Sequence, residues 1–237
     1  MSEQFIDLIP RMLPHPHETL TYVMGRFQPA EYSPELYLRH GLAYPPNIAK
    51  SVTKRQAEFL AGRLCARSIL AEHGYHQFDV ATGKHREPIW PEGIVGSITH
   101  HGKLAAAICY PDCNILGIGI DLADVVDAGA GDALLQLVVS ASELELLRSS
   151  VDELGLHHLL TLVFSVKESF FKAAFPQVRE YFGFDAVQVM HVDAAAGRIA
   201  FRCATSLSAR LLQGSVHSAH VEWVGADTVL TAVVLNR

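Results

Sequence analysis

The sequence predicts an α+β fold made of two halves of similar size. Two long segments, residues 51–73 and 151–174, show the apolar spacing of three and four residues that is typical of an amphipathic helix. Shorter apolar runs of strand length accompany both segments. The order is loops and strands, a long helix, a hairpin, a second long helix and further strands, which favours an α+β architecture. The boundary is expected near residues 112–116, so the domains are residues 1–114 and 115–237.

The first half is expected to be built around its long helix. Residues 1–50 hold seven of the eleven prolines and show little sustained period, so we expect short strands around residues 19–25 and loops elsewhere. Ser51 is the expected N-cap of the helix, and Gly74 is the expected stop. Residues 74–102, with glycines and prolines throughout, are expected to form a loop-rich connection.

The second half is expected to contain the other long helix and most of a sheet. Residues 104–110 and 115–122 are apolar runs separated by the turn Pro111-Asp112-Cys113-Asn114, and they predict an antiparallel hairpin in the middle of the chain. Shorter helical segments are expected near residues 133–138 and 142–149. Apolar runs after the last proline predict four strands, at residues 186–192, 199–203, 220–224 and 229–235.

Composition excludes several classes of protein. A net charge of −6 and a pI near 6.1 argue against a general binder of nucleic acid or anionic membranes. The four cysteines lie in apolar segments without metal-ligand spacing, which favours free thiols in a reducing compartment. The N-terminal segment carries Glu3 and Asp7 and no long apolar run, so neither a signal peptide nor a membrane anchor is expected. We expect a cytoplasmic enzyme.

Charge within the second long helix is the first sign of a functional site. Lys167 lies in the apolar stripe, and Glu168 and Lys172 project about 40° apart on one edge of it. One interpretation is a surface ion pair between Glu168 and Lys172, with Lys167 extending out to solvent. The other is a carboxylate and two ammonium groups that share a ligand.

A second acid favours the ligand-binding interpretation. Asp121 follows the apolar run Gly117-Ile118-Gly119-Ile120, where an unpaired carboxylate would cost several kcal/mol. Asp121 and Glu168 are therefore candidate ligands of a divalent metal ion. Mg²⁺ binds through one or two carboxylates together with substrate phosphates, so these acids fit a metal-diphosphate site.

Basic residues supply the positive charge that a phosphoryl centre needs. Lys167, Lys172 and His100 are suited to its oxygens. A further basic set lies on the first long helix and in the loop after it: Lys54, Arg55, Arg63, Arg67, Lys84 and Arg86. The sequence contains neither GxxxxGK[ST] nor GxGxxG, which argues against a P-loop or Rossmann nucleotide site.

Five motifs contain most of these residues, in one order along the chain. Gly119-Ile120-Asp121 is followed by Phe164-Ser165-x-Lys167-Glu168-Ser169-x-x-Lys172. Before them stand residues 58–67 (EFLAGRLCAR), 86–91 (REPIWP) and 96–100 (GSITH). Together these motifs resemble the Sfp/EntD-type 4'-phosphopantetheinyl transferases. The three motifs between residues 58 and 100 match the siderophore-associated EntD-like branch. The resemblance covers about residues 50–175.

The resemblance implies a fold, an activity and partners. The fold would be two similar α+β halves related by a pseudo-two-fold axis, each a small, mainly antiparallel sheet packed on one long helix, with the active site in the cleft between them. The implied reaction is Mg²⁺-dependent transfer of the 4'-phosphopantetheine arm of coenzyme A to a serine of an acyl or peptidyl carrier protein, releasing adenosine 3',5'-bisphosphate. A monomer is implied, with a siderophore or nonribosomal-peptide context.

The matching positions also imply roles for individual residues. Asp121 and Glu168 would be metal ligands, and Lys172 and His100 would hold the diphosphate. Lys167 would lie beside bound coenzyme A. Further residues implied to contact coenzyme A, mainly its 3'-phosphate and adenosine, are Arg55, Arg63, Lys84, Arg86 and Thr99.

Two positions leave alternatives open. The family usually has an acid two residues after the aspartate, where this sequence has Ala123. A water would then complete the metal shell, or Asp124 would swing in if the strand ended at Leu122. Glu143 matches a family glutamate near the metal and could accept the serine proton, or it could be a first-turn helix acid behind an N-cap at Ser142.

Two other functions compete with the transferase. A protein that holds coenzyme A or a carrier without chemistry would be expected to lack Asp121, Glu168 or Lys172, and all three are present. Another Mg²⁺-dependent phosphoester enzyme, such as a coenzyme A pyrophosphatase, would be expected to have a glutamate-rich box that this sequence lacks. Carrier docking is expected on apolar residues near the cleft, with residues 125–140 as the candidate segment.

Overall fold

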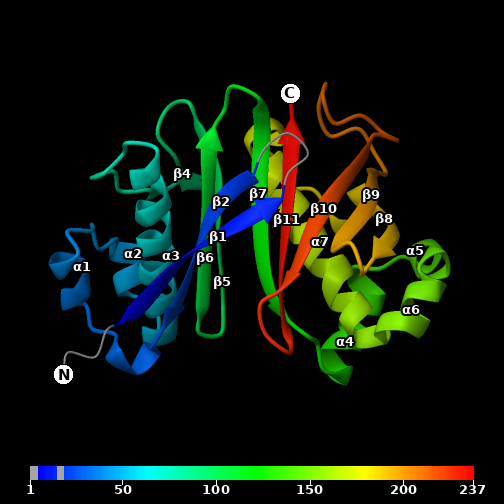
Figure 1. Cartoon of the computed structure of the whole chain (residues 1–237), viewed down its shortest axis with the longest axis horizontal. Coiled ribbons are helices and arrows are strands. Elements are labelled where there is room, and N and C mark those ends of the chain that lie inside the picture. The colour runs from blue at the N-terminus through cyan, green and yellow to red at the C-terminus, as the bar shows by residue number, and fades with distance from the viewer. Residues whose placement is uncertain (1–4, 15–18) are drawn as a thin grey trace. The chain divides into compact units, whose positions relative to one another are not determined.

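The computed structural model describes residues 5–14 and 19–237, and the chain divides into two compact units, Met1–Cys113 and Asn114–Arg237. Each unit contains one long helix and a sheet whose neighbouring strands are antiparallel (Figure 1). The predicted α+β class with mainly antiparallel sheets is confirmed.

The sheet of the first unit has the strand order β1-β2-β6-β5. Its strands are β1 (Ile6–Pro14), β2 (Thr19–Phe27), β5 (Ile94–His101) and β6 (Leu104–Pro111). Helix α3 (Thr53–Glu72) packs on β6, β2 and β5 and buries an apolar face that includes Leu60 and Ile69. The remaining elements are short: η1 (Pro29–Glu31), α1 (Glu35–Arg39), α2 (Pro46–Ala49), β3 (Ala81–Thr82) and β4 (Pro88–Ile89).

Several features of the first unit were not predicted correctly from the sequence. Strand β5 lies where a loop was expected, because its buried residues Ser97 and Thr99 are polar and the strand lacks apolar alternation. Strand β1 carries two prolines and stands at the edge of the sheet, where a missing N–H is tolerated. The expected N-cap at Ser51 is wrong, since Val52 precedes α3 and makes no side-chain cap. Gly74, at φ +86°, follows the helix as expected.

The hairpin predicted at residues 104–122 is wrong. Strand β6 pairs with β2 and β5, whereas β7 (Ile115–Asp124) pairs with β11 of the second sheet. Two neighbouring apolar runs fit a hairpin and also fit the last strand of one sheet followed by the first strand of another. The hairpin is instead β5–β6, which turns at Gly102 with φ +58°.

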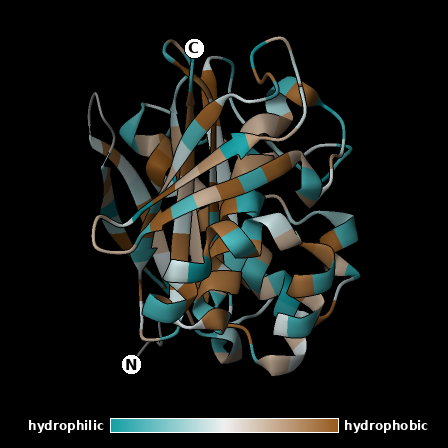
Figure 2. Ribbon diagram, turned by 90° about the vertical axis from the view of Figure 1, so that its right-hand side faces the viewer, coloured by the Kyte–Doolittle hydropathy of each residue, from teal (hydrophilic) through white to brown (hydrophobic). Residues whose placement is uncertain are grey.

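The sheet of the second unit has the strand order β7-β11-β10-β9-β8. The four strands predicted after the last proline are confirmed as β8 (Val187–Asp193), β9 (Arg198–Cys203), β10 (Val216–Trp223) and β11 (Thr228–Asn236). Burial alternates along β9, where Ile199 and Phe201 are buried and the two arginines are exposed. The strands and helices of the fold carry both hydrophobic and hydrophilic residues (Figure 2). A 3₁₀ turn, η2 (Phe184–Ala186), leads into β8.

The helices of the second unit follow β7. They are α4 (Ala128–Leu137), α5 (Ala141–Leu146), α6 (Arg148–Leu154) and α7 (Leu156–Val178). Helix α7 packs on β7 and β11. It begins later than expected because Gly155, at φ +82°, separates it from α6, and it continues through Pro176 to Val178. Within residues 5–14 and 19–237, no helix combines the length and the apolar character needed to span a membrane.

Candidate active site

Asp121 lies near the end of β7 and is 8% exposed. Lys172 of α7 reaches it across the layer between sheet and helix, with 2.7 Å from Nζ to Asp121 Oδ1. The same ammonium donates to the carbonyl of Ile120 at 2.9 Å. A carboxylate that would be costly to bury alone is thus paired and hydrogen-bonded, as a buried charge must be.

Two glycines make this pairing possible by bringing α7 against β7. A Cβ atom at Gly117 would lie 2.0 Å from the carbonyl oxygen of Ala173, and one at Gly119 would lie 2.0 Å from that of Ser169. Both contacts are with backbone, which cannot move aside as a side-chain end can. The Gly-x-Gly run before Asp121 therefore sets the helix-to-sheet distance that Lys172 spans.

Glu168 stands one turn before Lys172 and is half-buried. Burial raises the pKa of the Glu168 carboxyl, the Lys172 ammonium opposes this shift, and the Asp121 carboxylate adds to it. Glu168, Lys172 and Asp121 therefore form one electrostatic cluster. No group of three or more His, Cys, Asp or Glu side chains suited to a metal is found among the described residues.

A divalent ion fits the chemistry of this cluster. Asp121 and Glu168 supply two carboxylates, and Mg²⁺ commonly takes one or two from the protein while keeping waters and substrate phosphate oxygens. Two acids beside one ammonium would also accept an ion whose shell is completed from outside the protein. The donor set thus fits Mg²⁺ better than Ca²⁺, which requires six to eight oxygen ligands.

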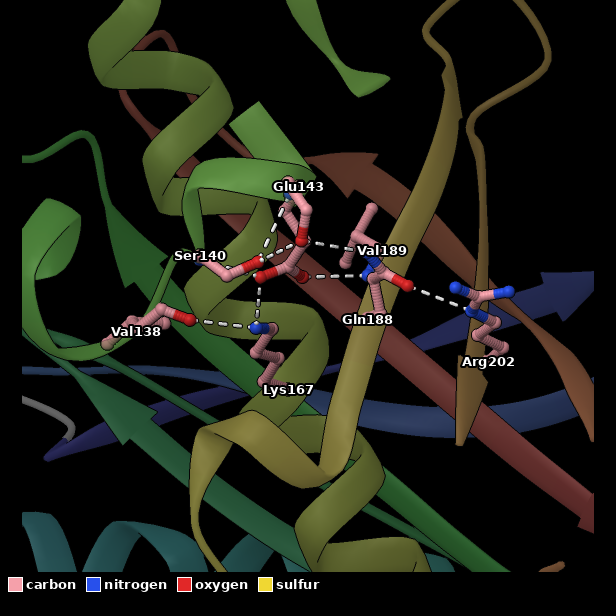
Figure 3. A network of polar contacts seen from close by, with 8 residues as sticks. Val138, Ser140, Glu143, Lys167, Gln188, Val189 and Arg202 are labelled. Atoms are coloured by element: carbon pink, nitrogen blue, oxygen red, sulfur yellow. Dashed lines mark hydrogen bonds and ion pairs between the residues drawn. The ribbon is translucent and has the colours of Figure 1, made fainter. Parts of the chain in front are cut away.

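Lys167 is buried in the second unit and points toward Glu143 and the carbonyl of Val138 (Figure 3). Its Nζ donates to the carbonyl of Val138 at 2.8 Å and to Glu143 Oε2 at 2.9 Å. Burial lowers the pKa of Lys167, while the hydrogen bond and the charge of Glu143 act in the opposite direction. Extension of Lys167 to solvent, one of the two interpretations, is therefore wrong.

Glu143 is itself fully enclosed. Its Oε1 accepts from the N–H of Val189 at 2.8 Å, and its Oε2 accepts from the N–H of Ser140 at 3.0 Å as well as from Lys167 (Figure 3). Ser140 is the N-cap of α5 and forms a capping box with Glu143, so the expected cap at Ser142 is wrong by two residues.

A pocket of about 240 Å³ opens beside Glu168 in the second unit. Aromatic side chains dominate its wall, and Phe171 and Tyr181 stack with ring centroids 5.6 Å apart. The lining residues are Lys167, Glu168, Phe171, Tyr181, Phe182, Gly183, Phe184 and Val187. The pocket therefore joins an apolar wall to the carboxylate of Glu168.

His100 of β5 belongs to a polar cluster on the first unit. Its Nε2 contacts a guanidinium nitrogen of Arg55, and its Nδ1 lies 3.5 Å from Glu58 Oε2. Glu58 also lies 3.9 Å from Arg55 on the same helix, α3. No role was assigned to Glu58 from the sequence, although its position three residues after Arg55 on a helix indicates that the two side chains can pair. Thr99, the neighbour of His100, is buried.

The other expected coenzyme A residues lie around the β3–β4 turn. The Arg63 guanidinium donates to Thr82 Oγ1 at 2.9 Å and lies 4.3 Å above the Phe59 ring. Burial lowers the pKa of Arg63 to about 10; Tyr37 has a smaller effect that raises this pKa, and Arg55 one that lowers it further. Lys84 and Arg86 are exposed on the turn itself.

Arg67 has a different environment from these residues. It donates to the carbonyls of His40 and Gly41 and forms an ion pair with Asp79. These contacts tie α3 to the loops on either side of it, so Arg67 is a structural residue of the first unit.

Comparison with known proteins gives the family. The family model described as 4'-phosphopantetheinyl transferase N-terminal domain matches residues 44–109, and that of the 4'-phosphopantetheinyl transferase superfamily matches residues 117–231. Enterobactin synthase component D of Escherichia coli O157:H7 is 32% identical over 161 residues, 67% of this chain and 75% of that protein. The chain belongs to the 4'-phosphopantetheinyl transferase superfamily.

Other members of this superfamily show similar likeness. The 4'-phosphopantetheinyl transferase PptT of Mycobacterium tuberculosis is 32% identical over 195 residues, which are 80% of this chain and 83% of that protein. The 4'-phosphopantetheinyl transferase Npt of Nocardia iowensis is 37% identical over 143 residues, 60% of this chain. The match to Npt spans 62% of that protein's length, less than two thirds.

The departure from the usual pattern of the transferase family lies on β7. Ala123 is buried and pairs with Val229 of β11. The strand continues to Asp124, whose Oδ1 accepts from Thr228 Oγ1 at 2.5 Å. The strand therefore does not end at Leu122, and Asp124 is exposed and held by β11. Asp124 was expected to replace the missing acid only if the strand ended at Leu122, and that condition is not met.

Proposed function

We propose that this chain transfers the 4'-phosphopantetheine arm of coenzyme A to a serine of an acyl or peptidyl carrier protein. The serine Oγ attacks the phosphorus that carries the pantetheine, a new P–O bond forms, and the diphosphate P–O bond breaks to release adenosine 3',5'-bisphosphate. The observation that carries the proposal is the Asp121–Lys172 pair beside Glu168, on β7 and α7 of the segment that the superfamily model matches.

Asp121 and Glu168 would hold Mg²⁺, which supplies charge neutralisation at the diphosphate when bound. Their two carboxylates match the ligand number that Mg²⁺ takes from proteins in phosphoryl transfer. With Ala123 in place of an acid, water is expected to complete the shell. Lys172, already beside Asp121, would hold a diphosphate oxygen as charge develops on the leaving group.

The proton of the serine needs an acceptor. The Glu143 carboxylate accepts three protein hydrogen bonds and is 1% exposed, which favours a structural role for it over proton abstraction. Glu168 is only half-buried and lines an open pocket, where a substrate hydroxyl can come within hydrogen-bond reach of it. Glu168 is therefore the better candidate for the base among the predicted carboxylates.

Coenzyme A would also contact the basic residues of the first unit. Arg55 and His100 lie together on α3 and β5, and Arg63, Lys84 and Arg86 lie around the β3–β4 turn. Guanidinium and ammonium groups suit the 3'-phosphate and the diphosphate. The nucleotide would lie beside these residues of the first unit, with Thr99 close to it.

The pocket beside Glu168 would take the pantetheine arm. The arm is a narrow chain with apolar and amide groups, and the pocket combines an aromatic wall with the carboxylate of Glu168. The partners would be coenzyme A and a carrier domain, the enzyme a cytoplasmic monomer. Enterobactin synthase component D is the name of several relatives, which favours a siderophore or nonribosomal-peptide pathway.

Intact mass spectrometry of an apo carrier protein tests this function. Incubation with the chain, coenzyme A and Mg²⁺ should add about 340 Da to the carrier, the mass of the covalent arm. Glu168→Gln or removal of metal should abolish the gain, whereas Glu145→Gln, at an exposed glutamate of α5, should keep it. No gain with several carriers, while coenzyme A still binds, would instead favour a non-catalytic binding protein.

A further inference from the structure

Three buried hydroxyl groups connect the interior of the second unit to Asp121. Ser165 and Ser169 lie four residues apart on α7, and Thr231 lies on β11. All three side chains are fully buried. Thr231 is the cross-strand partner of Asp121 in the pairing of β11 with β7, so secondary structure alone brings it next to the carboxylate.

The distances join the three hydroxyls into one continuous chain. Ser165 Oγ lies 3.0 Å from Asp121 Oδ2 and 2.9 Å from Thr231 Oγ1. Ser169 Oγ lies 2.7 Å from Thr231 Oγ1 and 3.1 Å from the Thr231 carbonyl oxygen. Each separation is within the normal range for hydrogen bonds between oxygens.

The number of hydrogens fixes the direction of the chain. An ionised carboxylate only accepts, so the one hydroxyl hydrogen of Ser165 goes to Asp121. Ser165 must then accept from Thr231. The single hydrogen of Ser169 is shared between two acceptors of Thr231, its Oγ1 and its carbonyl oxygen. The hydroxyls of Thr231 and Ser165 therefore both point their hydrogens toward the carboxylate, an arrangement in which each hydrogen bond strengthens the next.

The chain holds Asp121 on the side opposite to Lys172. Lys172 Nζ is bound to Oδ1, and Ser165 is bound to Oδ2. A carboxylate fixed at both oxygens has a fixed plane, whereas one held at a single oxygen can rotate. A fixed plane matters for a metal ligand because groups that orient a ligand contribute to metal affinity.

We propose that Thr231 and Ser165, supported by Ser169, are positioning residues that orient Asp121 for metal binding. The inference rests on the proposed function, in which Asp121 is a metal ligand. Thr231 stands in a strand whose neighbouring positions are buried and mostly apolar. Valine would fill nearly the same space as threonine there, so the hydroxyl serves the chain of hydrogen bonds.

Substitution at Thr231 with a matched control tests the inference. Thr231→Val removes the central hydroxyl, and Thr231→Ser keeps it. Thr161→Val makes the same chemical change at another fully buried threonine of the same unit, whose Oγ1 donates to the His157 carbonyl at 2.8 Å and accepts from the N–H of Val126 at 3.0 Å. Ser165→Ala removes the last hydroxyl of the chain with little change in volume.

The primary measurement is the affinity for Mn²⁺, as a probe of the Mg²⁺ site, by electron paramagnetic resonance on the whole chain without carrier. We expect Thr231→Val and Ser165→Ala to weaken Mn²⁺ binding about tenfold or more. Thr231→Ser should stay within about threefold of the unsubstituted chain, and Thr161→Val should match it. Circular dichroism melting identifies the temperature range in which each variant is folded, and the affinities are compared within that range.

Two outcomes separate this inference from the proposed function. If the unsubstituted chain binds Mn²⁺ and modifies a carrier, while Ser165→Ala and Thr231→Val bind Mn²⁺ equally well, the positioning role is wrong and the function stands. If the unsubstituted chain neither binds Mn²⁺ nor modifies a carrier, the proposed function fails and the inference fails with it. Should Thr231→Val not fold, Ser165→Ala decides alone.

Discussion

Lys167 and Glu143 form an ion pair inside the second unit, with 2.9 Å between Nζ and Oε2 and side chains 1% and 2% exposed. The pair joins α7 to the first turn of α5, and Glu143 extends the connection to β8 through the N–H of Val189. Each charge has its desolvation compensated by the other and by backbone groups. The pair is therefore a structural connection among three elements.

Removal of one partner should strongly destabilise the fold. Lys167→Met leaves the Glu143 carboxylate buried without its counter-ion, which typically costs about 3–5 kcal/mol of unfolding free energy. The double variant Lys167→Met/Glu143→Gln should recover part of this loss because no buried charge remains. Urea denaturation of both single variants and the double variant measures the coupling. A loss of unfolding free energy below about 1 kcal/mol in each single variant would show that the ion pair is not formed in solution.

Glu168→Gln should stabilise the protein while abolishing transfer. Burial raises the pKa of Glu168 above its ordinary value of 4.5 in the folded state, so between these two values the folded state binds more protons than the unfolded state. Stability contributed by this group therefore falls as pH rises through the folded pKa. The gain from Glu168→Gln should be largest above that pKa and shrink toward pH 4.

Thermal melting without metal, at several pH values, measures this effect. Added Mg²⁺ should raise the melting temperature of the unsubstituted chain, since a ligand stabilises the state that binds it. It should leave Glu168→Gln unchanged. Equal stabilisation of both proteins by Mg²⁺ would show that Glu168 is not a ligand of the metal ion.

Arg63 should distinguish coenzyme A from its 3'-dephospho form. A charge-assisted hydrogen bond is worth about 1.5–3 kcal/mol, so Arg63→Ala should raise KM for coenzyme A roughly tenfold to a hundredfold. KM for 3'-dephospho-coenzyme A should change little. Arg148→Ala, at an exposed arginine paired with Glu145, is the matched control. An equal rise of KM for both substrates would place Arg63 away from the 3'-phosphate.

Gly119→Ala should impair the site through the backbone. The added Cβ would meet the carbonyl oxygen of Ser169 at 2.0 Å, so α7 must move away from β7. Lys172 would then lose its fit to Asp121, and we expect lower stability together with weaker metal binding. Gly225→Ala, whose Cβ would have no neighbour closer than 3.9 Å, should change neither. Denaturation and Mn²⁺ titration of the two variants provide the comparison.

One of the four cysteines should react with an alkylating reagent much faster than the other three. Burial raises the pKa of Cys65 and Cys109 to about 12 and also raises that of Cys203. Cys113 is exposed. Since the thiolate is the reactive form, iodoacetamide at pH 8 should modify Cys113 first and the others only after unfolding. Peptide mass spectrometry locates the adducts, and early labelling of Cys65 in folded protein would contradict its burial.

The regular elements of the second unit were predictable because their core positions are apolar. The strands after Pro176 alternate or run apolar, and α7 shows a clear helical period. Strand β5 was not predictable, since Ser97 and Thr99 occupy its buried positions. Pairing of β6 and β7 was mispredicted because an apolar run does not specify its partner strand.

Only part of the geometry of the candidate site could be predicted from the sequence. The spacing of Glu168 and Lys172 follows from helical period, and the need of a buried Asp121 for a partner follows from solvation. Sequence could not show that Lys167 turns inward to Glu143, since the side-chain direction depends on where α5 docks. It also could not show the contacts of Thr231, which lies far from Asp121 along the chain.

The hydrogen bond from the N–H of Val189 to Glu143 has a consequence for association between molecules. Strand β8 is a terminal strand of its sheet, and the free N–H groups of such strands can recruit a strand from another chain. Here the carboxylate occupies the N–H of Val189, and the pairing of β8 with β9 shifts in register just beyond it. Helix α5 and its carboxylate thus cover this part of the strand edge, so detachment of α5 from β8 would expose a template for edge-to-edge aggregation.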